Sequence, residues 1–129
     1  MPQYWILKTE PSGYAFADLQ RDGRTRWDGI SNPVALRHLR SMHRGDQALV
    51  YHTGDEKRVV GLATVASEPD ENAVVELEAG RGVATPVTLA AIKADPAFKD
   101  LALVRMGRLS VVPVPAELWK KLLGMAGVR

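Results

Sequence analysis

Short apolar runs separated by turn-forming residues make up most of the chain. Residues 4–8, 47–52 and 59–66 are rich in aromatic and β-branched side chains, which favours strands. The second and third runs flank a turn at residues 53–56, so we expect them to form a hairpin. Gly61 inside the third run predicts a bulge or a close backbone approach. Residues 73–78 alternate apolar and acidic side chains and predict a half-exposed strand that ends at the glycine-rich residues 80–82.

Other segments have helical spacing or helix-start signals. Residues 14–20 predict a short helix, and Asn32-Pro33 supplies an N-cap and a first position for a helix over residues 34–44. Thr88 precedes a third short helix over 89–94, and Pro115 opens a final helix that we expect to end at Gly124. Residues 107–113 predict a turn that runs into a last strand. About six strands in succession, rather than alternating with helices, indicate an α+β fold with a curled sheet.

Length and composition narrow the class of protein. A chain of 129 residues predicts a single domain spanning residues 1–129. The absence of cysteine excludes disulfides, thiolate metal sites and cysteine nucleophiles, and fits a reducing compartment. No apolar run approaches the ~20 residues of a membrane span, and no signal peptide is visible. We therefore expect a cytoplasmic protein with no membrane association, and a monomer by default.

Charge is unevenly distributed although the net charge is only +2. Residues 21–44 contain six arginines and only two acidic residues, whereas residues 68–78 contain five acidic residues and no lysine or arginine. A clustered positive face is typical of a protein with a phosphate-bearing partner. The alternative is that these arginines only solubilise a helix surface. The candidate phosphate-binding residues are Arg24, Arg26, Arg37, Arg40 and Arg44.

The usual motifs of catalysis are missing. The sequence has no dinucleotide-binding glycine motif, no phosphate loop and no nucleophile elbow. His38 and His43 are five residues apart, which does not place them on one helix face for a metal ion. We therefore expect no cofactor and no metal.

One stretch does combine groups that suit a ligand. Residues 24–33, taken with Lys8-Thr9-Glu10-Pro11, place a tryptophan, a carboxylate, a glycine and a carboxamide within six residues: Trp27, Asp28, Gly29 and Asn32. An aromatic face beside hydrogen-bonding groups suits a planar, polar, heteroaromatic ligand. The alternative is that Trp27 is a core residue and Asp28-Gly29 an ordinary turn.

The same residues resemble the EVE domain family. The resemblance rests on Tyr4-Trp5-Ile6-Leu7-Lys8-Thr9-Glu10-Pro11, Trp27-Asp28-Gly29-Ile30-Ser31-Asn32, Leu39-Arg40-Ser41-Met42 with Gly45-Asp46, Tyr51-His52-Thr53, Val60-Gly61-Leu62-Ala63, Pro86-Val87-Thr88-Leu89 and Gly107-Arg108-Leu109-Ser110-Val111. It implies a PUA-like fold, a small and strongly curved mixed β-barrel flanked by short helices. It also implies binding of a modified or flipped base of RNA or DNA, by analogy with YTH domains, which hold a methylated adenine in an aromatic cage.

By that analogy Trp27 is a cage wall, and the other pocket residues read the base edge or line the rim. The residues that the resemblance implies are Thr9, Glu10, Trp27, Asp28, Asn32, Tyr51, His52, Arg105 and Arg108. The sequence departs from the family where Pro33 follows the asparagine and where Asn72-Ala73 stands in place of a second tryptophan, which implies fewer cage walls.

Two other functions stay open at this point. A small nucleotide- or nucleoside-acting hydrolase of the ASCH type would use Glu10, Asp28 or His52 as its acid–base group. A protein-interaction domain would instead present its arginine face to an acidic partner.

Overall fold

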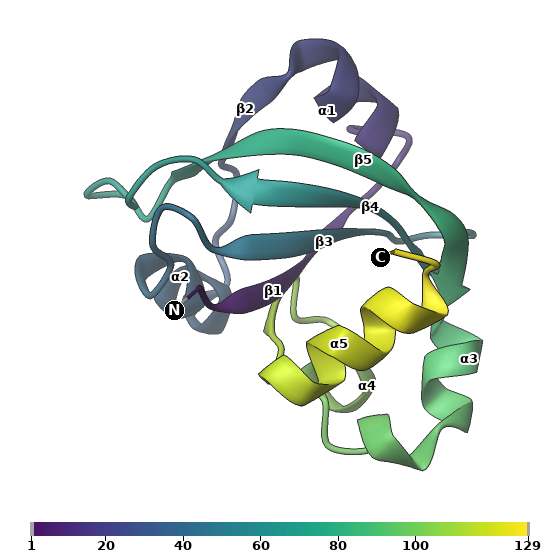
Figure 1. Ribbon diagram of the computed structural model, residues 1–129. Coiled ribbons are helices and arrows are strands. Elements are labelled where there is room, and N and C mark those ends of the chain that lie inside the picture. Colours follow the sequence, from purple (N-terminus) through teal and green to yellow (C-terminus); the bar gives the residue numbers. More distant parts are fainter. Residues whose placement is uncertain (1, 129) are drawn as a thin grey trace.

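A six-stranded mixed sheet that curls into a half-barrel organises the computed structural model, which describes residues 2–128 (Figure 1). The strand order is β2-β5-β4-β3-β1-β6. The strands are β1 (Tyr4–Thr9), β2 (Arg24–Trp27), β3 (Gln47–His52), β4 (Arg58–Val65), β5 (Val75–Thr88) and β6 (Val111–Pro113). β1 and β3 pair in parallel, and every other neighbouring pair is antiparallel. The α+β class and the curled sheet of about six strands are confirmed.

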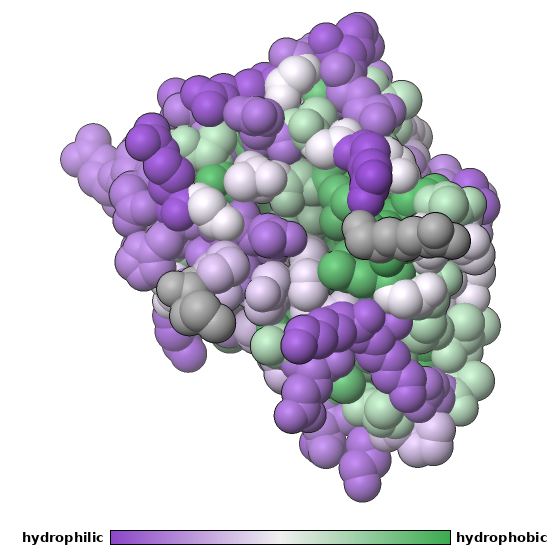
Figure 2. All heavy atoms as spheres, in the orientation of Figure 1, coloured by the Kyte–Doolittle hydropathy of each residue, from purple (hydrophilic) through white to green (hydrophobic). Residues whose placement is uncertain are grey.

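Short helices flank the sheet. They are α1 (Phe16–Asp22), α2 (Pro33–Arg40), α3 (Leu89–Ala94), the 3-10 helix η1 (Pro96–Phe98), α4 (Ala102–Arg105) and α5 (Ala116–Met125). In Figure 1, α3, α4 and α5 lie together below the sheet, whereas α1 and β2 lie at its upper end. Figure 2 shows that this face is largely hydrophilic over α1 and β2, with an apolar area between the sheet and α5. None of the helices between residues 2 and 128 has the length and apolar character needed to cross a membrane.

The central strands are apolar because both of their faces are covered. Trp5, Ile6 and Leu7 in β1 are all buried, as are the last five residues of β3. This is the continuous apolar pattern of a strand enclosed on both sides. The edge strand β2 is different, since Arg24 and Arg26 are exposed and Trp27 is buried. The sheet therefore keeps charge at its edge and apolar side chains at its centre.

Gly61 allows α1 to pack closely against the sheet. A Cβ atom at this position would overlap the ring of Phe16 from α1. The β4–β5 register also shifts on both sides of Gly61. Both the bulge and the close approach that the sequence indicated at Gly61 are therefore present.

Several boundaries differ from the sequence-based expectations. Residues 24–27 were not predicted as a strand but form β2, because each of them pairs with β5. β5 does not end at the glycines of residues 80–82 but continues to Thr88, and shifts in its register with β4 absorb the irregularity. α2 ends at Arg40, earlier than expected, where the Ser41 hydroxyl donates to the Arg37 carbonyl oxygen at 3.0 Å. α5 continues one residue past Gly124 to Met125.

Candidate functional site

A pocket of about 380 Å³ lies where the end of β1 approaches β2. Three strands separate β1 from β2 in the sheet order, so the curl of the sheet brings them together. We call it the Trp27 pocket. Its lining residues are Lys8, Thr9, Glu10, Tyr14, Thr25, Arg26, Trp27, Asp28 and Ile30. The volume falls in the range of roughly 300–1,000 Å³ that is typical of small-ligand sites. Four of the nine expected base-pocket residues, Thr9, Glu10, Trp27 and Asp28, therefore lie together.

Two aromatic rings form a corner in this pocket. The rings of Tyr14 and Trp27 lie 6.4 Å apart between centroids, with an angle of 75° between their planes. Trp27 is only 7% exposed and belongs to the hydrophobic core, whereas Tyr14 is half-buried. Trp27 is thus a core residue that also lines the pocket, and its role as the wall of a base site stays a prediction. Because the rings are nearly perpendicular, a planar ligand can stack on one of them but cannot be sandwiched between both.

Hydrogen bonds fix Tyr14 at the pocket. Its phenolic hydroxyl donates to a carboxylate oxygen of Asp22 at 2.8 Å, and its carbonyl oxygen accepts from the Thr9 hydroxyl at 2.6 Å. Burial raises the pKa of the Tyr14 phenol, and Asp22 acts in the same direction. The tyrosine therefore stays neutral at physiological pH, with an orientation set from both ends.

Two carboxylates stand at the pocket, in different environments. Glu10 accepts hydrogen bonds from the backbone N–H and hydroxyl of Ser12 and from the Thr53 hydroxyl. The Ser12 backbone bond, followed by the Thr53 bond, lowers the pKa of Glu10. Asp28 is exposed, and its carboxylate has no hydrogen-bond or ion-pair partner within residues 2–128. Asp28 is therefore the carboxylate that is free to accept a bond from a ligand.

The remaining expected base-pocket residues lie outside this lining. Asn32 caps α2, where its side-chain oxygen accepts from the N–H groups of Val34 and Ala35 at 2.9 and 3.1 Å. Asn32 and Arg108 line a separate hollow of about 280 Å³. Tyr51 is buried in β3, and Arg105 pairs with Asp100 at 3.1 Å. The structure thus gives Asn32 a local structural role and does not bring these residues to the Trp27 pocket.

His52 is buried and occupied on both ring nitrogens. Its Nε2 accepts the Phe16 backbone N–H at 3.0 Å, and its Nδ1 lies 2.9 Å from a Glu56 carboxylate oxygen. This arrangement requires the tautomer with the proton on Nδ1, in which Nδ1 donates to Glu56. The histidine joins the end of β3 to the start of α1 and does not line the Trp27 pocket.

The five candidate arginines are all exposed but fall into two groups. Arg24 and Arg26 project from β2, where they pair with Glu78 at 3.4 Å and with Asp70 at 3.6 Å. Arg37 and Arg40 lie on α2, and Arg44 follows it, with its Nε donating to the Ala66 carbonyl oxygen at 3.2 Å. Exposed pairs of this kind contribute about 0–1 kcal/mol each, so a phosphate can compete with the carboxylates. Of the five, Arg26 lines the Trp27 pocket.

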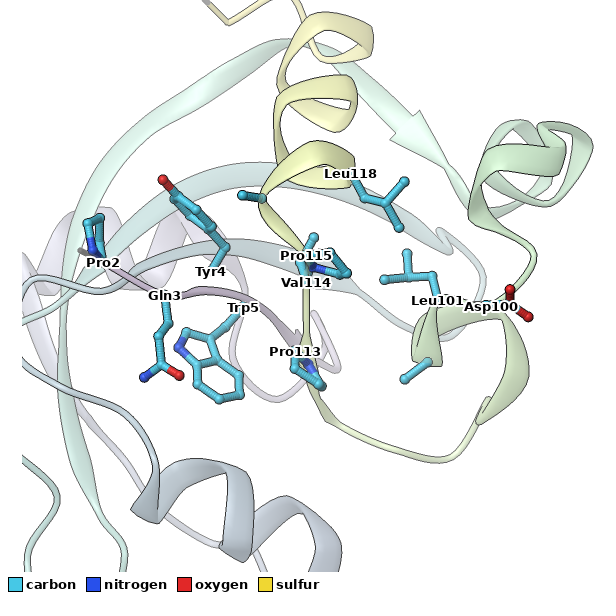
Figure 3. Close-up of a pocket in the computed structure, with 12 residues that line it drawn as sticks. Pro2, Gln3, Tyr4, Trp5, Asp100, Leu101, Pro113, Val114, Pro115 and Leu118 are labelled. Atoms are coloured by element: carbon cyan, nitrogen blue, oxygen red, sulfur yellow. The ribbon is translucent and has the colours of Figure 1, made fainter.

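A larger hollow of about 570 Å³ lies at the other end of β1 (Figure 3). It is mostly apolar, and Leu101, Val114 and Leu118 are among the residues that line it (Figure 3). The polar atom of the Trp5 ring is already used, since its Nε1 donates to Asp46 at 3.0 Å. Binding sites combine an apolar wall with a few convergent polar groups, which this hollow lacks. The smaller Trp27 pocket is therefore the better candidate.

Four residues that line the Trp27 pocket were not among the expected base-pocket or phosphate-binding residues: Lys8, Tyr14, Thr25 and Ile30. Tyr14 matters most, because it supplies the second aromatic wall. Its position in the sequence, just before a short helix, indicates no contact with a strand thirteen residues later. The curl of the sheet, together with the packing of α1 against β2, places the two rings together.

The curled mixed half-barrel with flanking helices is a PUA-like fold. It is shared with the ASCH protein of Zymomonas mobilis at a TM-score of 0.57 and 13% identity, covering 95% of this chain and 94% of that one. More specifically, the chain belongs to the EVE domain family, whose family model matches residues 3–125.

Several relatives agree with this assignment. A Rhodopseudomonas palustris protein solved by NMR is 39% identical with a TM-score of 0.90, covering 97% of this chain and 93% of that one. Rat thymocyte nuclear protein 1 is 31% identical over 80 residues, which is 53% of this chain and 35% of the relative. The chain thus spans about a third of the length of that curated relative. The human THYN1 protein, solved in complex with DNA containing 5-methylcytosine, is 24% identical with a TM-score of 0.87, covering 98% and 99% of the two chains.

Proposed function

We propose that this protein binds nucleic acid and holds a modified or flipped base in the Trp27 pocket. The observation that carries the proposal is the corner formed by Tyr14 and Trp27 beside polar groups in a pocket of about 380 Å³. A base stacks on one ring and meets the other at its edge, where an added methyl group contacts the aromatic surface. Thr9, Thr25 and Asp28 line the pocket, which supports a role for them in reading the polar edge of the base.

The energies of base stacking and of base extrusion are of similar size, which supports this arrangement. Stacking of a base on an aromatic side chain contributes roughly 1–3 kcal/mol. Extruding a base from a duplex costs a few kcal/mol, and least at a mismatched or single-stranded position. We therefore expect single strands or destabilised sites to bind best. Salt-sensitive contacts from the exposed arginines add affinity that does not depend on sequence.

The human THYN1 complex with 5-methylcytosine DNA supports the same class of ligand. That protein has the same fold over almost the whole of this chain, although the identity is only 24%. It makes methylated cytosine in DNA the first ligand to test, with RNA and other methylated bases beside it.

Hydrolysis has less support from the geometry. Both ring nitrogens of His52 are occupied, and the lowered pKa of Glu10 moves it away from the near-neutral value that suits general acid–base catalysis. Both carboxylates among the candidates are exposed, but only Asp28 has no hydrogen-bond or ion-pair partner within residues 2–128. Turnover of a nucleoside panel that is lost in Asp28→Asn would favour the hydrolase over the binding module.

The decisive experiment is a binding titration of short single strands and duplexes that contain cytosine, 5-methylcytosine or another methylated base, at two salt concentrations. We expect tighter binding to a modified strand, and a change in Trp27 fluorescence on binding. Trp27→Ala should abolish the base preference. Because Trp27 also packs in the core, Tyr14→Ala serves as a second variant, with thermal unfolding checked for both. Binding without base preference in the wild type would refute the pocket.

A further inference from the structure

A second, basic hollow lies beside the Trp27 pocket. Its volume is about 160 Å³, and three lysines line it: Lys8, Lys57 and Lys93. Lys8 also lines the Trp27 pocket, so the two hollows share a wall at the end of β1. We call the second one the lysine hollow.

The ammonium group of Lys8 is fixed at the wall of the lysine hollow. Its Nζ donates to the Gly107 carbonyl oxygen at 3.0 Å and lies 5.7 Å from the centroid of the Tyr51 ring. Gly107 and Tyr51, the two residues that this ammonium group contacts, also line the lysine hollow. Burial lowers the pKa of Lys8, because the charged ammonium is partly removed from water. A neighbouring anion would compensate that desolvation.

Lys57 and Lys93 come together through a hydrogen bond between their elements. Lys57 lies in the β3–β4 hairpin with a left-handed φ of 48°, and its carbonyl oxygen accepts the Leu89 N–H at 2.8 Å. This bond joins the hairpin to the start of α3, and Lys93 lies one turn further along that helix. Both lysines are exposed, and neither forms an ion pair with another residue in the 2–128 range. Arg24 and Arg26, by contrast, already have carboxylate partners.

Carboxylates lie close to the lysine hollow but do not line it. Glu10 approaches Gly54, which lines the hollow, but its oxygens are taken by Ser12 and Thr53. Asp55 and Glu56 belong to the same turn as Lys57, and Glu56 pairs with His52 and Arg58. The residues that line the hollow include three lysines and no carboxylate. The excess of positive charge suits an anion with several oxygen atoms.

We propose that the lysine hollow binds a backbone phosphate of the same nucleic-acid strand whose base enters the Trp27 pocket. This inference rests on the proposed function and extends it, because Lys8 lies between the two hollows. The phosphate would sit next to the extruded base and hold the strand in register, whereas the base pocket supplies selectivity.

The test compares two double variants with the same change in charge. Lys57→Gln/Lys93→Gln removes two of the three lysines, and Lys99→Gln/Lys120→Gln removes two exposed lysines that line none of the hollows described above. Binding of a fluorescent single strand containing the preferred base is measured from low to moderate salt. For the first variant we expect about tenfold weaker binding at low salt, and a slope of log K against log salt reduced by about 1. The control variant should change neither the affinity at low salt nor the slope by a comparable amount.

The preference for a modified over an unmodified base separates the two proposals. Lys57→Gln/Lys93→Gln should keep this preference, since Trp27 and Tyr14 are intact. Equal losses in both double variants, or an unchanged slope in the first, would overturn the lysine hollow. A reduced slope in a protein that shows no base preference would support the phosphate site and refute the base pocket.

Discussion

The ring of Tyr14 lies nearly perpendicular to the ring of Trp27, at 75° and 6.4 Å between centroids. We predict that Tyr14→Ala weakens binding of the preferred base by about 1–3 kcal/mol, because one stacking surface is lost. Tyr14→Phe should bind nearly as well as the wild type, since it keeps the ring and loses only the bond to Asp22. Titration of both variants with the same strand makes the comparison. Equal affinities for the alanine and phenylalanine variants would show that the ring is not a wall of the base site.

His52 should matter for stability rather than for binding. We predict that His52→Leu destabilises the fold by about 1–3 kcal/mol, because the buried Phe16 N–H loses its acceptor. Chemical denaturation measures the loss. Nucleic-acid affinity, measured where the variant is fully folded, should stay close to that of the wild type. If the variant kept its stability but bound nucleic acid much more weakly, His52 would have a role in binding instead.

Elements with local sequence signals were predicted correctly, whereas features that depend on contacts between residues far apart in the sequence were not. β3 and α3 match their predicted bounds, because an unbroken apolar run and a capping threonine are local signals. β2 is only four residues long and becomes a strand through pairing with β5, about fifty residues later. Thr9, Glu10, Trp27 and Asp28 were expected at a pocket because of the resemblance to the EVE domain family and the polar and aromatic residues around Trp27, and all four line the Trp27 pocket. Tyr14 and the three lysines were missed because a curled sheet and a hairpin–helix contact place them at the two hollows.

Gly61 should tolerate no side chain. We predict that Gly61→Ala destabilises the protein by about 1–3 kcal/mol, because the new methyl group overlaps the buried ring of Phe16 and the site is overpacked. Gly124→Ala is the matched control, since a Cβ there meets no atom within 4 Å and the residue lies in α5. The control should be stabilising by roughly 0.5–1 kcal/mol, as expected for an alanine in a helix. Thermal unfolding of the two variants should therefore shift in opposite directions.

Asp46 is a second residue whose loss should be costly. It is 2% exposed, and its carboxylate accepts from the Trp5 indole and from the backbone N–H groups of Gln3 and His43, each at 3.0 Å. We predict that Asp46→Ala costs about 3 kcal/mol, because it leaves these donors without partners. Chemical denaturation measures the effect, and Asp55→Ala, at an exposed turn, provides the comparison. Similar losses in the two variants would contradict a structural role for the Asp46 carboxylate.

Glu10 should make stability depend on pH in the acid range. Its folded-state pKa lies below the ordinary glutamate value of about 4.3, so the folded protein binds the proton less readily than the unfolded chain. The stabilisation from its bonds to Ser12 and Thr53 is therefore fully present above that ordinary value, and is lost as pH falls through the lowered pKa. We predict that the free energy of unfolding of the wild type exceeds that of Glu10→Gln at pH 6, and that this difference shrinks toward pH 3. Glu71→Gln is the control, because Glu71 is exposed and forms no side-chain hydrogen bond within the part of the chain that the structure describes. The prediction fails if the difference in free energy of unfolding between the wild type and Glu10→Gln does not change with pH. It also fails if Glu71→Gln shows the same dependence on pH. Either result would show that the bonds from Ser12 and Thr53 to Glu10 do not stabilise the folded protein.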